Sequence, residues 1–261
     1  MLRSLWQYRY FILTSIRAEM KGRFARSRLG GLWFLLNPLA QALIFSIVLS
    51  QVLQARLPNT EIKGAYPIYL LAGLAGWTLF SDILGRCTTI FIEQGSVMKK
   101  ISFPRLCLPV IVWGRALVDH LLLLAAILVV FMFFGHFVGW PLLALPLGIV
   151  LISGLAFGLG IIIGVVNVFS RDIGQVVPIV MQLWFWMTPI VYPASVIPEK
   201  FRGIMAINPM VGLIGLYQSV LLSRQWPPLE TLIAPAVLVV VITALAFFFF
   251  RRASPELVDA L

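Results

Sequence analysis

Charged residues are scarce in this sequence of 261 residues, making up 11% of it, whereas hydrophobic residues make up 61%. A soluble domain is about one quarter charged and about half apolar. This imbalance excludes an ordinary water-soluble globule. Abundant Leu, Ile, Val and Phe exclude disorder, and the lack of a heptad or Gly repeat excludes coiled coil and collagen. The chain is therefore predicted to be a polytopic membrane protein.

Acidic residues and cysteines are also few. Ten Asp and Glu stand against 20 Lys and Arg, giving a net charge of +10. In a soluble protein this excess would suggest nucleic acid, but in a membrane protein it reports topology, so no nucleic-acid partner is expected. The two cysteines, Cys87 and Cys107, lie twenty residues apart. That spacing indicates neither a disulfide framework nor a metal site.

Motifs for enzymatic chemistry are missing. The sequence contains no GxxxxGK[ST] phosphate loop and no GxGxxG turn between a strand and a helix, so nothing predicts a nucleotide site. His120 and His136 do not form an HExxH pattern, and no Ser lies in a GxSxG motif. The chain is not expected to be an enzyme, and no cofactor is expected on it.

Long apolar runs supply the fold prediction. A helix that crosses about 30 Å of hydrocarbon needs about 20 apolar residues, and lipid excludes other open structures. Six runs qualify: Leu32 to Leu53, Tyr66 to Leu84, Leu106 to Phe134, Pro141 to Val168, Gln175 to Tyr192 and Leu232 to Phe250. We predict an all-α integral membrane protein with one domain, 1–261. Its six transmembrane helices form a bundle over 32–250, between cytoplasmic segments 1–31 and 251–261.

A seventh apolar stretch, Ile204 to Leu222, is interrupted by Asn208-Pro209. With six spans and an internal N-terminus, thirteen Lys and Arg residues fall in cytoplasmic segments and five in external ones. This distribution follows the positive-inside rule, whereas a seventh crossing would place Arg251 and Arg252 outside. The stretch is therefore predicted to be an external re-entrant or interfacial helical pair between spans five and six.

The N-terminal segment is predicted to be an amphipathic interfacial helix. One helical face carries Leu2, Leu5, Trp6, Ile12, Leu13, Ile16 and Met20. Such a stripe suits a helix lying in the membrane plane, with its cations toward anionic headgroups. A basic flank that only anchors the chain to the membrane is the alternative.

Two pairs of intramembrane charges have i,i+4 spacing: Asp82 with Arg86, and Arg115 with Asp119. Each pair can meet on one helical face. We interpret them as structural ion pairs, within a helix or between spans two and three. An ion-coupling site is less favoured because isolated acidic residues make a poor cation path.

Several strings along the chain resemble ABC-2-type polysaccharide export permeases. They are the segment from Arg17 to Trp33 with Asn37-Pro38, the string from Met98 to Arg105 with Leu108-Pro109, Ser170-Arg171-Asp172-Ile173, the segment from Thr188 to Pro193, and Asn208-Pro209-Met210. Thr188 stands where Ser is common in that family. The order and spacing extend over nearly the whole chain, and the likeness is greatest to permeases for O-antigen, capsule and teichoic acid.

This resemblance implies a subunit of the bacterial inner membrane with cytoplasmic termini. It implies a homodimer that pairs with two copies of a separate ABC ATPase, where ATP and Mg²⁺ would bind. The exported molecule would be a lipid-linked polysaccharide, with O-antigen the first expectation. The alternatives are an ABC-2 permease for a drug or lipid, and a secondary transporter, for which no internal repeat of spans is evident.

Two sets of site residues follow from the resemblance. Aromatic residues could line a conduit on which sugar rings stack, although packing against lipid or neighbouring helices is the alternative; the candidates are Trp33, Phe34, Trp77, Phe80, Trp184, Phe185 and Tyr192. Cytoplasmic loops could contact the ATPase, and here the candidates are Glu93, Gln94, Lys99, Lys100, Arg171 and Asp172.

Overall fold

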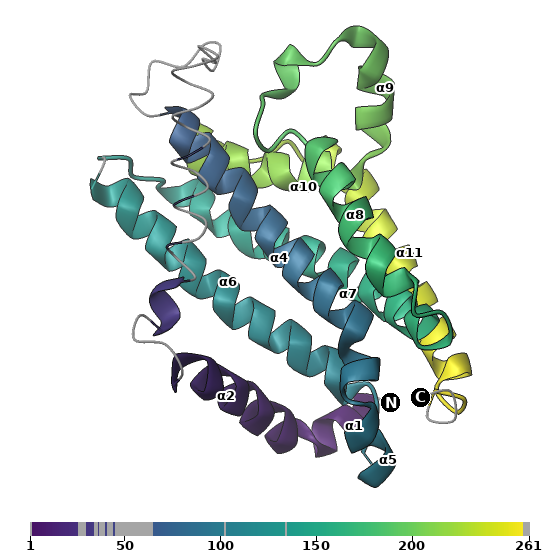
Figure 1. The fold of residues 1–261 in the computed structure, drawn as a ribbon. Coiled ribbons are helices and arrows are strands. Elements are labelled where there is room, and N and C mark those ends of the chain that lie inside the picture. Colours follow the sequence, from purple (N-terminus) through teal and green to yellow (C-terminus); the bar gives the residue numbers. More distant parts are fainter. Residues whose placement is uncertain are drawn as a thin grey trace.

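The computed structural model describes residues 2–25, 30–33, 36, 40, 44, 65–101, 103–133 and 135–257. All regular secondary structure in these residues is helical (Figure 1), which confirms the all-α prediction for this part of the chain. It includes four helices that are long and apolar enough to cross a membrane. They are α4 (Ala65–Glu93), α6 (Cys107–Phe133), α7 (Leu145–Phe169) and α11 (Glu230–Ala253).

The predicted first and fifth spans stand apart from these four. Most of the first span, 32–53, lies outside the described residues. The fifth is α8 (Ile173–Trp186), whose 14 residues give about 21 Å of helix, shorter than a hydrocarbon core. It ends six residues before the predicted end at Tyr192. The reason lies in Thr188-Pro189, because a proline cannot donate a helical hydrogen bond and disfavours helix in the residue before it.

Helix α4 lies at the centre of the bundle. Twenty of its 29 residues are buried, whereas most of the side chains of α11 remain exposed. Glycines bring α7 close to it: a Cβ added at Gly160 would lie 2.6 Å from Cys87 Cβ, and one at Gly164 would lie 2.2 Å from the Cys87 carbonyl oxygen. Only glycine permits this approach of the two backbones.

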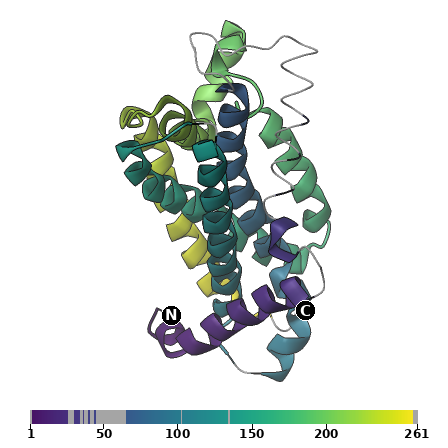
Figure 2. The same cartoon turned by 90° about the vertical axis from the view of Figure 1, so that its left-hand side faces the viewer.

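The N-terminal helices α1 (Leu2–Gln7) and α2 (Arg9–Ala25) cross the end of the bundle near α6 (Figure 2). The predicted apolar stripe divides between two directions. Ile12 and Ile16 pack with Cys107 and Ile111 of α6, whereas Trp6 is 71% exposed and Leu13 is also exposed. Part of the predicted stripe therefore packs on α6 as protein core, and the position of this helix at the membrane surface stays a prediction.

The opposite end of the molecule carries short helices (Figure 1). A 3-10 turn η3 (Trp140–Ala144) precedes α7, and η4 (Ala194–Val196) follows α8. The stretch predicted as a helical pair forms α9 (Glu199–Ile207), α10 (Pro209–Gln218) and the π-helical turn η5 (Ser219–Ser223). The break falls at Asn208, as the Asn-Pro dipeptide predicts, and α10 packs against α4, α7 and α11.

Candidate functional site

Four of the predicted conduit aromatics form one cluster between α4 and α8. The ring centroids of Trp77 and Phe185 are 5.5 Å apart, and those of Phe80 and Trp184 are 5.1 Å apart, both in edge-on arrangements. Trp77 also lies 5.5 Å from Phe80. Such edge-to-face pairs stabilise packing beyond their burial alone. Phe80 is fully buried, so it supports the cluster from behind and presents no surface to a ligand.

A groove with a volume of about 390 Å³ opens beside this cluster. Its lining is aromatic, aliphatic and neutral polar: Leu74, Trp77, Thr78, Ser81, Met181, Gln182, Phe185 and Trp186. The hydroxyls of Thr78 and Ser81 donate to the carbonyls of Ala75 and Thr78, at 3.0 and 3.2 Å. Each hydroxyl oxygen can still accept a hydrogen bond. The groove can therefore offer ring faces and polar atoms to a neutral polar molecule without holding a charge.

The other predicted conduit residues that the structure describes, Trp33 and Tyr192, do not line this groove. Tyr192 is absent from the groove lining, and its hydroxyl donates to the carbonyl of Trp186. Trp33 is half-exposed, and Phe34 lies outside the described residues.

Two tyrosines of α4 hold the non-helical segment that follows α8. Tyr66 Oη donates to the Val191 carbonyl and Tyr69 Oη to the Pro189 carbonyl, both at 2.7 Å. Gln218 Nε2 of α10 donates to the same Pro189 carbonyl at 2.9 Å. These bonds satisfy backbone groups that the early end of α8 leaves outside a helix. Sequence reasoning missed them, because donors and acceptors lie far apart in the chain.

Asn208 connects the end of α8 to the start of α10. Its Oδ1 accepts from Trp184 Nε1 at 2.8 Å and from the Met210 backbone at 3.0 Å, the latter as an N-cap. Its Nδ2 donates to Thr188 Oγ1 at 3.1 Å. The strings around Thr188-Pro189 and Asn208-Pro209, separate in the sequence, thus meet at one junction beside the aromatic cluster.

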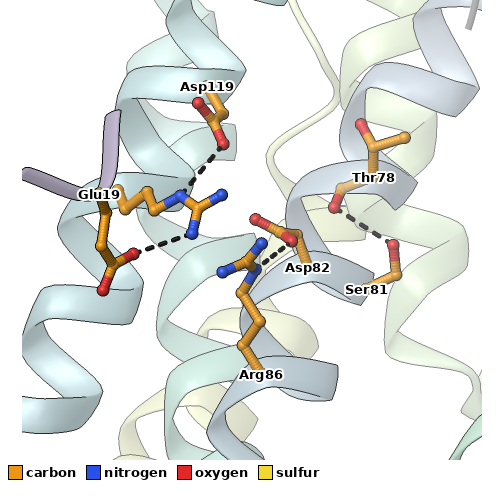
Figure 3. A network of polar contacts seen from close by, with 7 residues as sticks. Glu19, Thr78, Ser81, Asp82, Arg86 and Asp119 are labelled. Carbon is orange, nitrogen blue, oxygen red and sulfur yellow. Dashed lines mark hydrogen bonds and ion pairs between the residues drawn. The ribbon is translucent and has the colours of Figure 1, made fainter. Parts of the chain in front are cut away.

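The intramembrane charges form two separate groups (Figure 3). On α4, Arg86 Nε lies 2.7 Å from Asp82 Oδ1, and both side chains are about one third exposed. On α6, Arg115 Nη1 lies 2.8 Å from Glu19 Oε2 of α2, and its Nε lies 3.8 Å from Asp119 Oδ2. Glu19 was missed in the sequence because nothing there pairs a residue before the first span with one in the third.

The predicted loop between spans two and three contains a short helix, α5 (Gly95–Lys100). Glu93 is the last residue of α4, which runs nine residues past its predicted end, and Gln94 is the N-cap of α5. Lys99 and Lys100 are exposed, whereas Gly95 and Met98 are buried. The helix therefore presents a cationic face outward and is seated on the bundle by its other face.

Arg171 and Asp172 are exposed in the connection between α7 and α8. Buried Asn167 fixes this connection, since its Nδ2 donates to the Thr88 carbonyl and its Oδ1 accepts from Gly174 N, both at 2.8 Å. The sequence singled out the charged residues but not Asn167, whose partners are on other helices. In the part of the chain that the structure describes, no group of three His, Cys, Asp or Glu residues could hold a metal ion.

Comparison with known proteins adds the following likenesses. The sequence pattern of the family described as ABC-2 type transporter matches residues 10–222. The O-antigen export system permease protein RfbA of Myxococcus xanthus is 30% identical over 263 residues, which cover 100% of this chain and 99% of that protein. An RfbA of Klebsiella pneumoniae is 32% identical over 200 residues, 75% of this chain and 74% of that protein. The polysialic acid transport protein KpsM of Escherichia coli is 30% identical over 203 residues, 76% of each chain.

Proposed function

This chain belongs to the ABC-2 type transporter family. On that premise we propose that it is the transmembrane subunit of an ATP-driven exporter of a polysaccharide. The polysaccharide that we favour is an O-antigen. The names of its relatives support the substrate class. The observation that carries the proposal is the groove between α4 and α8, whose lining joins aromatic rings with neutral polar groups. Rings can stack on the CH faces of sugars while hydroxyl and amide groups bond to sugar hydroxyls. The absence of charge lets a long polymer slide.

The proposal includes a homodimer. In a single chain, Thr78, Ser81 and Gln182 of the groove would meet hydrocarbon, where unsatisfied polar groups are costly. Helix α8 and its C-cap residue also present an exposed apolar stripe beside the groove, formed by Val176, Ile179, Val180, Leu183 and Met187. A second copy packed on this stripe would enclose the groove and shield the polymer from lipid.

The membrane arrangement is proposed as six spans in the bacterial inner membrane with both termini cytoplasmic and a re-entrant pair formed by α9 and α10. The end with α5 would then face the cytoplasm, where its cations satisfy the positive-inside rule. Two copies of a separate ATPase, holding ATP and Mg²⁺, would bind there, because the sequence has no phosphate loop.

Obstruction of the groove tests the transport role. Ser81→Trp would fill the groove with a bulky side chain and should reduce surface glycan at least tenfold in a strain that depends on this gene. The matched control is Phe248→Trp, at an exposed position of α11 that does not line the groove. Membrane levels of both variants are measured by immunoblot. Normal export by Ser81→Trp at normal abundance would contradict the proposed conduit.

Energy coupling is placed at α5 and the end of α4. We expect Glu93→Arg to leave the subunit inserted but to weaken ATPase binding or uncouple hydrolysis from export, because its carboxylate can pair with an ATPase arginine. Glu230→Arg, at the opposite end of the bundle, is the control. Co-purification, ATPase activity and surface glycan are measured together. Wild-type values of all three for Glu93→Arg would remove this residue from the contact.

A further inference from the structure

One polar stripe interrupts the burial of α4. Between Trp77 and Phe91 the residues that are not buried are Thr78, Ser81, Asp82, Gly85, Arg86 and Thr89. Their three- and four-residue spacing places them on one helical face. Every other residue of this segment is buried, so the accessible face of the most central helix is the polar one. This is the reverse of what contact with lipid would select.

The stripe begins in the groove and continues to an ion pair. Thr78 and Ser81 line the groove, and Asp82 and Arg86 follow them along the same helix (Figure 3). Space is open beside the pair, since a Cβ added at Gly85 would meet no atom of the described residues within 4 Å. The route of a molecule leaving the groove along α4 would therefore pass the Arg86 guanidinium.

Arg86 is only partly engaged by the protein. Its Nε bonds to Asp82 Oδ1 at 2.7 Å, and its terminal amino groups have no hydrogen-bond partner within the described ranges. A guanidinium held at Nε keeps a pair of N–H donors that match the two oxygens of a carboxylate or phosphate. The carboxylate of Asp82 offsets its positive charge, which would keep a bound anion exchangeable.

We propose that Arg86, oriented by Asp82, binds a carboxylate or phosphate group of the exported molecule as that molecule passes along α4. The inference rests on the proposed export function and adds a chemical preference to it. The anionic group could belong to the glycan or to its lipid anchor. Both offer the same paired oxygens to the guanidinium, so the two sources are separated by experiment.

Binding measurements on the full-length chain in lipid nanodiscs test the site directly. The probes are undecaprenyl diphosphate, an oligomer of sialic acid and a neutral dextran oligomer, and binding is followed by tryptophan fluorescence. Arg86→Gln should weaken binding of at least one anionic probe about tenfold or more, because the change removes the charge-assisted hydrogen bonds to the anion. Arg86→Lys should retain part of the affinity, and dextran binding should not change. The probe that loses affinity identifies the source of the anion.

Equal affinity of wild type and Arg86→Gln for both anions would overturn the site, as would wild-type binding of neither anion. A thermal melt of each variant establishes that the protein is folded. The export proposal is tested separately in a strain that lacks the wild-type gene. Normal surface glycan in that strain would contradict the export function itself.

Cysteine accessibility gives a second measurement that needs no substrate. The background is Cys87→Ala with Cys107→Ala, both at buried positions. Arg86→Cys should react with a membrane-impermeant anionic thiosulfonate, whereas Leu84→Cys, at a buried position on another face of α4, should not. Protection of Arg86→Cys to the same degree as Leu84→Cys would contradict a polar path along this face.

Discussion

Arg115 and Arg86 occupy neighbouring helices and each has an aspartate four residues away, yet their surroundings differ. The Arg115 side chain is 8% exposed and lies between carboxylates from two helices, Glu19 and Asp119. The Arg86 side chain is 31% exposed and, among the residues that the structure describes, pairs with one carboxylate, from its own helix. The same local spacing thus produces a buried junction between elements in one place and an accessible guanidinium in the other.

The difference teaches that burial and partner number decide what an intramembrane arginine does. Removing one member of a buried ion pair leaves an uncompensated charge, which costs about 3–5 kcal/mol, whereas an exposed pair contributes about 0–1 kcal/mol. We therefore expect replacement of Arg115 to lower the stability of the folded chain, and replacement of Arg86 to affect mainly the binding of the exported molecule.

The largest effect is expected from Arg115→Met. It would leave Glu19 and Asp119 without their shared cation and should lower the free energy of unfolding by about 3–5 kcal/mol. Equilibrium unfolding of the purified chain in mixed micelles measures it. Arg86→Met is the matched control and should lose less than about 1 kcal/mol. Equal losses in the two variants would remove the distinction between the sites.

An intermediate effect is expected from Glu19→Gln. Arg115 would retain Asp119, and Glu19 is itself 38% exposed, so the loss should be about 1 kcal/mol. The change should concentrate in α2, which Glu19 links to α6. Relative to wild type, the rate of backbone hydrogen exchange should then increase more in 9–25 than in α7. A uniform increase over both helices would show that the ion pair does not hold α2 specifically.

The smallest effect on stability is expected from Asp82→Asn. The amide can still accept a hydrogen bond from Arg86, and the site is partly solvated, so the change should be below about 0.5 kcal/mol. Thermal melts of Asp82→Asn and Asp119→Asn are measured side by side. Asp119 is buried against Arg115, so its replacement should lower the melting temperature more than that of Asp82. The reverse order would contradict the assignment of the structural role to the α6 group.

Local spacing was sufficient to predict both i,i+4 pairs and the break at Asn208. Local spacing could not predict contacts between residues far apart in the chain, such as that of Glu19 with Arg115, which are 96 positions apart. The apolar runs located α4, α6, α7 and α11 because lipid leaves helices as the only solution for such segments. They overextended α8, since hydropathy continues through Pro189 and Ile190 although the backbone does not remain helical there.

The aromatic candidates show a similar limit. Composition and resemblance named residues on α4 and α8, but only packing reveals that Trp77 and Phe185 border the groove while Phe80 lies behind it. Nothing in the local sequence distinguishes Tyr66 and Tyr69 from other aromatic residues of the chain. Their hydroxyls instead hold the carbonyls beyond α8, a role that depends on a chain segment about 120 residues away.

The glycine contact between α7 and α4 bears on how force would travel. With Gly160 and Gly164 fitted against Cys87, sliding or turning of either helix would bring larger side chains into this close contact, so we expect the two helices to move together. Helix α5 continues from α4, and the Arg171-Asp172 connection continues from α7. Forces applied at these two surface points would therefore act on one rigid unit, and relative motion would occur where that unit contacts α6 and α8.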